Sequence, residues 1–228
     1  MATWELRRDE LTTYFDRTAA AAWEALTSDA PVSRIRATVR AGRERMRALL
    51  LANLPDDLTG TTLLDAGCGT GALAAEAARR GAAVTAVDVS PRLIATARER
   101  LGGQGTAIRF VAGDMLSPAL GRFDHVVAMD SLIHYRADDI VAALAGLAER
   151  TERAILFTVA PRTPLLSVMH AAGRLFPRGD RAPAIEPVAA ARLSRAIARA
   201  PALAGWRLTG PERVTSGFYL SEAWELKR

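Results

Sequence analysis

The stretch Thr62–Asp88, TLLDAGCGTGALAAEAARRGAAVTAVD, decides the fold of this chain. It predicts an apolar strand at 62–66, followed by a glycine loop from Gly67 to Gly71. A helix is expected at 72–80, ended by Gly81, and a second strand at 83–87 that ends at Asp88. A strand, a tight loop, a helix and another strand in this order are typical of a parallel β-α-β unit.

The same alternation continues toward the C-terminus and defines the fold class. Continuous apolar strands separated by helices indicate a parallel sheet with both faces covered. After Pro161 the alternation breaks down, and two closing strands are expected to form an antiparallel edge. We predict an α/β, Rossmann-like, doubly wound, mostly parallel seven-stranded sheet. The further strands are expected at 108–111, 123–129, 154–159, 206–208 and 218–226, and the further helices at 91–101, 137–149, 165–176 and 188–199.

An N-terminal helical arm precedes the sheet. Apolar residues recur at spacings of three and four over 32–53, and a second amphipathic helix is indicated over 14–26. We therefore divide the chain into an arm or lid at 1–56 and a main domain at 57–228. Residues 160–200 are expected to form a substrate-covering insertion within that domain.

Composition and charge narrow the functional classes. Half of the 228 residues are apolar, which excludes wholesale disorder, and the net charge of +5 suggests an anionic partner. Residues 30–50 carry six arginines and one glutamate, and 170–228 are also basic, while the centre is slightly acidic. This segregation favours a catalytic core with basic covering elements. The single Cys68 excludes a disulfide framework, and the lack of a signal peptide or long apolar run predicts a cytoplasmic protein.

The glycine loop indicates which ligand the sheet binds. Its G-x-G-x-G spacing differs from the dinucleotide fingerprint, and no Gly-Lys-Ser/Thr follows as in a P-loop. Asp65, just before the loop, suits a cationic ligand end better than a pyrophosphate. Asp88 is placed to accept two ribose hydroxyls, and Asp114 follows the third strand, within reach of an adenine amino group.

Together these features resemble the class I S-adenosylmethionine-dependent methyltransferases. The resemblance implies S-adenosylmethionine as cofactor. It also implies a set of cofactor-binding residues: Asp65, Ala66, Gly67, Gly69, Gly71, Asp88, Val89, Gly113, Asp114, Met115 and Asp130. No Asn/Asp-Pro-Pro-aromatic motif follows the fourth strand, which argues against nucleic acid as the methyl acceptor.

More specific strings resemble the magnesium-protoporphyrin IX O-methyltransferases of bacteriochlorophyll biosynthesis. They include YFDRTAAAAWEAL (14–26), MDSLIHY (129–135) and FPRGDRAPAI (176–185), and the resemblance covers nearly the whole chain. It implies methyl transfer to one propionate carboxylate of Mg-protoporphyrin IX, giving the monomethyl ester and S-adenosylhomocysteine. The magnesium belongs to the substrate, so no protein-bound metal is expected.

The family resemblance also implies roles for individual residues and partners. His134 and Tyr14 are expected to orient the reacting carboxylate, and the candidate substrate-binding residues are Tyr135, Arg162, His170, Arg178 and Arg181. The large porphyrin-binding subunit of magnesium chelatase is an expected partner, and loose association with photosynthetic membranes is expected too.

Three other readings stay open at this point. The first is a class I methyltransferase of another small carboxylate, a phenol or a quinone. The second is a porphyrin carrier without catalysis, against which the intact glycine loop argues. The third is a basic RNA methyltransferase, which would bind RNA with a strong salt dependence.

Overall fold

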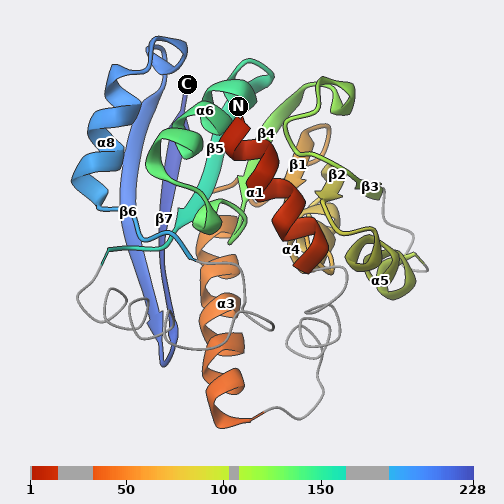
Figure 1. The fold of residues 1–228 in the computed structure, drawn as a ribbon. Coiled ribbons are helices and arrows are strands. Elements are labelled where there is room, and N and C mark those ends of the chain that lie inside the picture. The colour runs from red at the N-terminus through yellow and green to blue at the C-terminus, as the bar shows by residue number, and fades with distance from the viewer. Residues whose placement is uncertain (1, 15–32, 103–107, 163–184) are drawn as a thin grey trace.

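The computed structural model describes residues 2–14, 33–102, 108–162 and 185–228 (Figure 1). Their centre is one seven-stranded sheet of order β3-β2-β1-β4-β5-β7-β6, in which β7 is antiparallel to both of its neighbours. The predicted doubly wound, mostly parallel sheet is therefore confirmed. The strands are β1 (Thr62–Ala66), β2 (Ala83–Asp88), β3 (Ile108–Ala112), β4 (Phe123–Ala128), β5 (Thr151–Val159), β6 (Arg207–Ser216) and β7 (Tyr219–Lys227).

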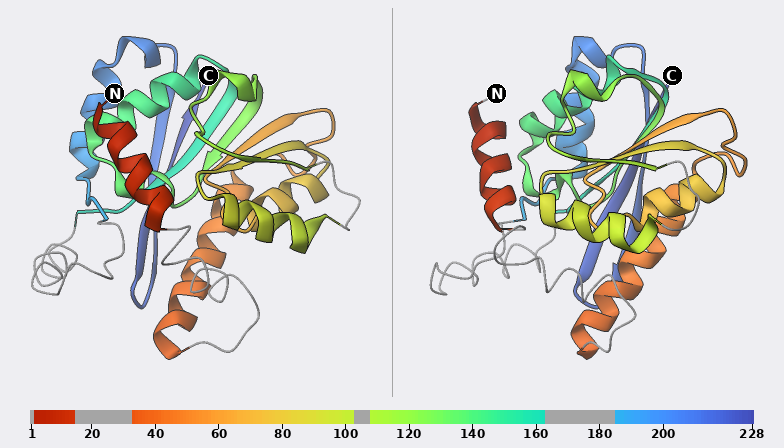
Figure 2. Two further views of the ribbon diagram at one scale, coloured as in Figure 1. Left: turned by 45° about the vertical axis from the view of Figure 1, so that its right-hand side comes forward. Right: turned by 90° about the vertical axis from the view of Figure 1, so that its right-hand side faces the viewer.

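Helices cover both faces of the sheet, because successive strand residues point to opposite sides. Leu63 and Val127 face a core shared with α3 and α4, whereas Leu64 and Val126 face the core of α1, α6 and α8. Figure 2 shows α1 and α3 on opposite sides of the sheet. The helices are α1 (Ala2–Thr13), α3 (Arg34–Ala52), α4 (Ala72–Arg79), α5 (Pro91–Leu101), α6 (Ala137–Ala148) and α8 (Ala190–Arg199).

Most element boundaries agree with those predicted. The start of α5 is specified locally, since the Ser90 hydroxyl accepts the Leu93 N–H and Pro91 occupies the first turn. The largest strand difference is β6, which extends to Ser216 although only 206–208 were expected. Most of its residues are exposed, so it lacks the apolar run on which the prediction relied. The helices expected at 14–26 and 165–176 lie largely outside the described residues.

Helix α3 belongs to the main core rather than to a separate arm. Met46 and Leu50 are fully buried in the cluster that contains β1 and α4. Gly42 packs on Tyr219 of β7, and in Figure 1 α3 extends alongside the β6–β7 hairpin. Thr38, one turn before Gly42, also lies in close contact with Gly217 of the β6–β7 turn, so both halves of α3 are anchored, and a lid would have to involve residues before this helix.

Helix α1 was not predicted from the sequence. Among residues 4–13, whose burial the structure describes, only Trp4 and Leu11 are buried, and both join the cluster formed with α6 and α8. Two apolar residues seven positions apart are too few to give a helical period in the sequence. Tertiary contacts rather than local pattern therefore hold α1 against the domain.

Candidate functional site

A cavity of about 600 Å³ opens where β1, β2, β3 and β4 end. Ligands of open α/β sheets bind at this edge, beyond the carboxyl ends of the strands and next to the point where the strand order reverses. The wall combines the strand ends with α1, Tyr14, α3 and the segment after β4. Its lining includes Trp4, Arg8, Tyr14, Arg36, Arg40, Arg43, Asp65, Gly67, Gly69, Asp88, Gly113, Asp114, Met115, Asp130, Ser131, His134, Tyr135 and Ile185.

The glycine loop forms the floor of the cavity. Gly67 and Cys68 both donate their N–H groups to the Val87 carbonyl, which ties the loop to the end of β2. Gly67 has φ 86°, and a Cβ atom there would lie 2.5 Å from the Cβ of Ser131. Only glycine allows this turn and this close approach, so β1 and the loop after β4 share one wall.

Two buried carboxyl groups flank the loop. Asp65 accepts the Ala74 N–H at 3.1 Å, and Asp88 accepts the N–H groups of Gly69 and Ser90, each at 2.9 Å. Neither forms an ion pair with any residue in the described ranges. Burial is the main cause that raises the pKa of both groups, to about 7 for Asp65. The predicted pair of acids is thus brought together, in a place that suits a cationic, hydroxyl-bearing ligand.

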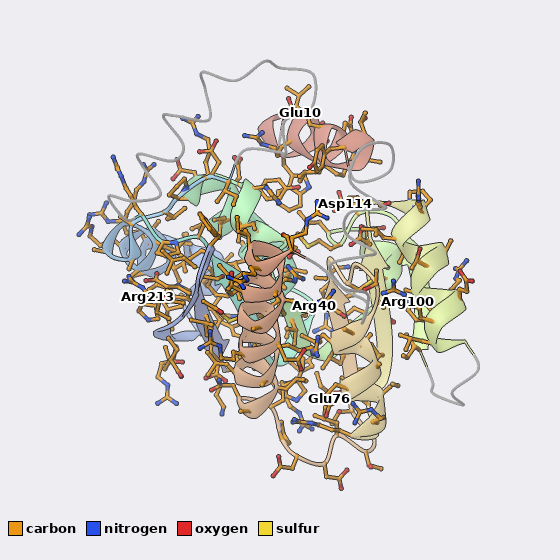
Figure 3. All side chains as sticks on the ribbon, turned by 90° about the horizontal axis from the view of Figure 1, so that it is seen from below. Glu10, Arg40, Glu76, Arg100, Asp114 and Arg213 are labelled. Carbon is orange, nitrogen blue, oxygen red and sulfur yellow. The ribbon has the colours of Figure 1, made fainter. Side chains whose placement is uncertain are left out.

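Asp114 lies under α1. Its Oδ1 accepts the Leu116 N–H at 2.8 Å, and its Oδ2 accepts from Trp4 Nε1 at 3.4 Å and from Arg8 at 3.1 Å. The carboxylate was predicted from the sequence, whereas the two side chains of α1 that bind it were not. Figure 3 shows Asp114 beside this helix. An adenine amino group would join an already bonded carboxylate here, so its contact with Asp114 stays a prediction.

Tyr135 is stacked on Trp4, with ring centroids 4.1 Å apart and an interplanar angle of 19°. The stack closes the cavity between α1 and the loop after β4. Burial is the first cause that raises the pKa of Tyr135, so its phenol keeps its proton. Both aromatic side chains line the cavity and make this part of its wall largely apolar.

Asp130 connects the end of β4 to distant elements. Its carboxylate pairs with Arg43 of α3 at 2.5 Å and accepts the Tyr219 hydroxyl of β7 at 3.0 Å. Thr158 of β5 adds a longer hydrogen bond, and Asp130 itself has φ 54°. The residue was predicted to bind cofactor, but these contacts assign its carboxylate to holding α3 and β7 together. A direct contact with a cofactor stays a prediction.

The two predicted substrate-orienting residues line the same cavity from different elements. His134 ends a 3-10 turn after β4 and is buried, and Tyr14 directly follows α1. Burial raises the pKa of Tyr14, so its phenol is a hydrogen-bond donor at neutral pH. The chain thus brings two polar side chains, 120 positions apart in sequence, to one cavity.

The remaining candidates are placed less favourably. Arg162 is exposed and is not part of the cavity wall; its backbone N–H donates to the Val188 carbonyl. His170, Arg178 and Arg181 lie outside the described residues. Within the described ranges, no group of three or more His, Cys, Asp or Glu side chains is placed to hold a metal ion.

Comparison with known proteins gives a consistent result. A family model described as "Magnesium-protoporphyrin IX methyltransferase C-terminus" matches residues 128–228, and a general methyltransferase-domain model matches 63–153. The chain is 51% identical to a magnesium-protoporphyrin O-methyltransferase of Rhodobacter capsulatus over 96% of each chain. It is 31% identical to the chloroplastic magnesium protoporphyrin IX methyltransferase of Arabidopsis thaliana, over 93% of this chain and 68% of that protein.

The fold has a solved counterpart as well. The crystal structure of magnesium protoporphyrin IX methyltransferase from Synechocystis PCC 6803 with bound SAH superposes with a TM-score of 0.80 and 26% identity. The match covers 96% of this chain and 99% of that one.

Proposed function

This chain belongs to the family of magnesium-protoporphyrin O-methyltransferases, and we propose that it transfers a methyl group from S-adenosylmethionine to one propionate carboxylate of Mg-protoporphyrin IX. The products are the monomethyl ester and S-adenosylhomocysteine. The main observation behind this proposal is that the glycine loop with its two acids and the basic helix α3 line the same cavity. The acidic loop suits the positively charged cofactor, and the basic helix suits the negatively charged porphyrin.

The residues at the loop fit the cofactor. Asp88 keeps acceptor capacity for ribose hydroxyls beside its two backbone bonds, and Asp65 favours a positive ligand end. The Ser131 hydroxyl is buried in the cavity wall without a hydrogen-bond partner in the described residues, so it is available to a ligand. When bound, S-adenosylmethionine supplies an electrophilic methyl carbon attached to a positively charged sulfur.

The residues of the chain then have to position the nucleophile. A propionate has a pKa near that of glutamate, about 4.3, so it is ionised at neutral pH and needs no strong general base. His134 and Tyr14 donate hydrogen bonds to this carboxylate and direct one oxygen toward the methyl carbon. The stacked Trp4 and Tyr135 exclude water on the apolar side. Positioning and desolvation supply the acceleration.

The test combines purified protein, S-adenosylmethionine and Mg-protoporphyrin IX and follows the porphyrin by mass spectrometry. A gain of one methyl group is expected. If the protein binds S-adenosylmethionine but leaves this porphyrin unmodified, the proposal is wrong, and small phenols, quinones and carboxylates become the substrates to screen. A porphyrin carrier would bind the tetrapyrrole but not the cofactor. An RNA methyltransferase would label RNA instead.

Removing the orienting donors is expected to slow the reaction without preventing cofactor binding. His134→Ala and Tyr14→Phe should each lower kcat roughly tenfold to a hundredfold, because a misplaced nucleophile forfeits orientation. Steady-state kinetics with Mg-protoporphyrin IX and calorimetry with S-adenosylhomocysteine measure the two effects. The control is His125→Gln, since His125 is buried in β4 away from the cavity and its ring nitrogens form no hydrogen bond with any described residue. If His134→Ala and Tyr14→Phe both keep the turnover of the unmodified protein, the orienting roles of His134 and Tyr14 are refuted.

Cofactor affinity is expected to rise between about pH 6 and 7.5, because the pKa of Asp65 is raised to about 7. A cation next to this carboxyl group favours its ionised form, so binding at pH 6.5 should release a proton. Calorimetry in two buffers of different ionisation enthalpy measures that release. Asp65→Asn should abolish it, and the absence of proton release in the unmodified protein would contradict the assignment.

The same shift affects stability in the opposite sense. The folded chain holds the Asp65 proton more tightly than the unfolded chain, whose aspartate pKa is about 3.9. The stability gained from protonated Asp65 is therefore complete below about pH 4 and is lost as the pH rises through about 7. Bound cofactor should offset this loss.

We also propose a cytoplasmic location with peripheral docking at a photosynthetic membrane. None of the described helices has the length and apolar character needed to cross a bilayer. Ile35 in α3 and Phe218 in the β6–β7 turn are 56% and 59% exposed, and both adjoin the Thr38–Gly217 contact. Such apolar side chains beside arginines suit an anionic lipid surface. The Phe218→Ser variant should co-sediment with anionic vesicles less than the unmodified protein does.

Binding to the porphyrin-binding subunit of magnesium chelatase is a separate proposal, and a pull-down with that subunit tests it.

A further inference from the structure

We infer that Arg36 and Arg40 of α3 form a binding site for the propionate that is not methylated, an inference that rests on the proposed function. The first observation is a stripe of arginines that enters the cavity wall from one helix. Arg36, Arg40, Arg43 and Arg47 all line the cavity, at spacings of four, three and four. These spacings place them on one face of α3, next to the face that buries Gly42 and Met46.

The arginines of this stripe differ in what they bind. Arg43 is paired with Asp130, and Arg47 with Glu44 one turn earlier in the helix. Arg36 and Arg40 precede them, one turn apart, in the first half of the helix. No ion pair between Arg36 and another described residue is recorded. Figure 3, which views the protein from below, labels Arg40 on α3 and Asp114 near α1.

The cavity therefore has two electrostatically different ends. The cofactor end contains the buried acids Asp65 and Asp88. The α3 end contains Arg36 and Arg40, while the one acid of this helix, Glu44, is paired with Arg47. A ligand cation is stabilised at the first end and a ligand anion at the second. This polarity matches a pair of ligands of opposite charge that occupy the cavity together.

The porphyrin brings two carboxylates, of which only one reacts. The reacting carboxylate has to point toward the cofactor, between His134 and Tyr14. The other also enters the cavity as an anion, and removing it from water without a partner is costly. A guanidinium binds a carboxylate through two parallel hydrogen bonds, so two arginines one turn apart are suited to hold it.

The arginines expected from the sequence to bind substrate were Arg162, Arg178 and Arg181, of which the last two lie outside the described residues. Arg162, the described member of that group, lies off the cavity wall. Arg36 and Arg40 do line it, and they come from an element that is anchored to β7 through Gly42 and Tyr219. An anchored helix holds the carboxylate at a fixed distance from the cofactor end.

A carboxylate site on α3 also accounts for the transfer of a single methyl group. For a second methylation, the monoester would have to turn over and present its remaining carboxylate to the cofactor. That orientation places a neutral ester, which cannot form an ion pair, where Arg36 and Arg40 would otherwise hold the carboxylate. The site therefore disfavours the monoester as a substrate.

The test compares two porphyrins with three forms of the protein. The porphyrins are Mg-protoporphyrin IX and a Mg-porphyrin in which one propionate is replaced by an ethyl group. The unmodified protein should bind the dicarboxylate roughly tenfold to a hundredfold more tightly, as expected for hydrogen bonds between charged groups. The Arg36→Gln/Arg40→Gln double variant should lose this preference by weakening only its binding of the dicarboxylate.

Arg34→Gln is the matched control, because Arg34 is exposed in the same helix, as Arg36 is, but does not line the cavity. It should keep the full preference. Porphyrin binding is read from quenching of tryptophan fluorescence, and unchanged affinity for S-adenosylhomocysteine shows that each variant is folded. A double variant that keeps the preference for the dicarboxylate overturns the inference. Lack of methyl transfer by the unmodified protein would overturn the proposed function alone, since the binding comparison does not depend on transfer.

Discussion

Asp88→Ala is expected to weaken binding of S-adenosylmethionine by at least about a hundredfold, because two hydrogen bonds to a charged acceptor are worth about 1.5–3 kcal/mol each. The Asp88 carboxylate also accepts the N–H groups of Gly69 and Ser90, so its loss frees the glycine loop at the same time. Calorimetry with S-adenosylmethionine and with S-adenosylhomocysteine measures the effect. Both should lose affinity alike, since they share the ribose.

The control for this variant is Asp124→Ala. Asp124 also accepts two hydrogen bonds, from the N–H and hydroxyl of Thr62, but at the start of β4, away from the cavity. Its replacement should lower stability and leave cofactor affinity within about threefold, a change smaller than 1 kcal/mol. Comparable losses of affinity in the two variants would mean that Asp88 acts only through general stability.

Gly42→Leu is expected to cost about 3 kcal/mol of unfolding free energy, at the upper end of the range for overpacked sites. A Cβ atom at Gly42 would lie 2.5–2.7 Å from the Cβ, Cγ and Cδ1 atoms of Tyr219. These atoms lie near the backbone of β7, so the ring cannot simply swing away. Displaced α3 also strains the contact between Arg43 and Asp130, and kcat should fall together with the thermal midpoint. Denaturant unfolding and kinetics measure both.

Two alanine variants separate the effect of close packing at Gly42 from the effect of helix propensity. Gly42 and Gly146 both lie inside helices, and alanine gains up to about 1 kcal/mol over glycine there. A Cβ at Gly146 has no neighbour within 4 Å. Gly146→Ala should therefore stabilise the protein and Gly42→Ala should destabilise it. Equal effects at the two positions would refute close packing between α3 and β7.

The cofactor half of the site was predictable because its signals are local. The loop from Asp65 to Gly71 requires glycine for its backbone and close contacts, and β1 and β2 are short apolar runs on either side of one helix. These patterns occupy adjacent residues, so no knowledge of tertiary contacts was needed. Asp65 and Asp88 followed directly from their places at the strand ends.

The substrate half was predictable only in part. Asp130 binds Arg43 and Tyr219, which lie 87 and 89 positions away, and nothing near Asp130 indicates these partners. Trp4 and Arg8 act through Asp114, more than a hundred positions later. The arginines of α3 recur with a helical period, but the same period is expected whether they face a ligand or solvent. Which of them turn toward the cavity depends on how Gly42 seats the helix on β7.

Strand β4 lies at the middle of the sheet and separates two groups of strands that serve different purposes. On one side, β1, β2 and β3 carry the cofactor loop; on the other, β5, β7 and β6 carry the anchorage of α3. The general methyltransferase model covers 63–153, which includes the first part, and the family-specific model covers 128–228, so the two overlap from the end of β4 to the start of β5. Exchange of the segment between about residues 60 and 128 would therefore replace the cofactor loop, while α1, α3 and the chain after β4, which line the acceptor side of the cavity, would stay together.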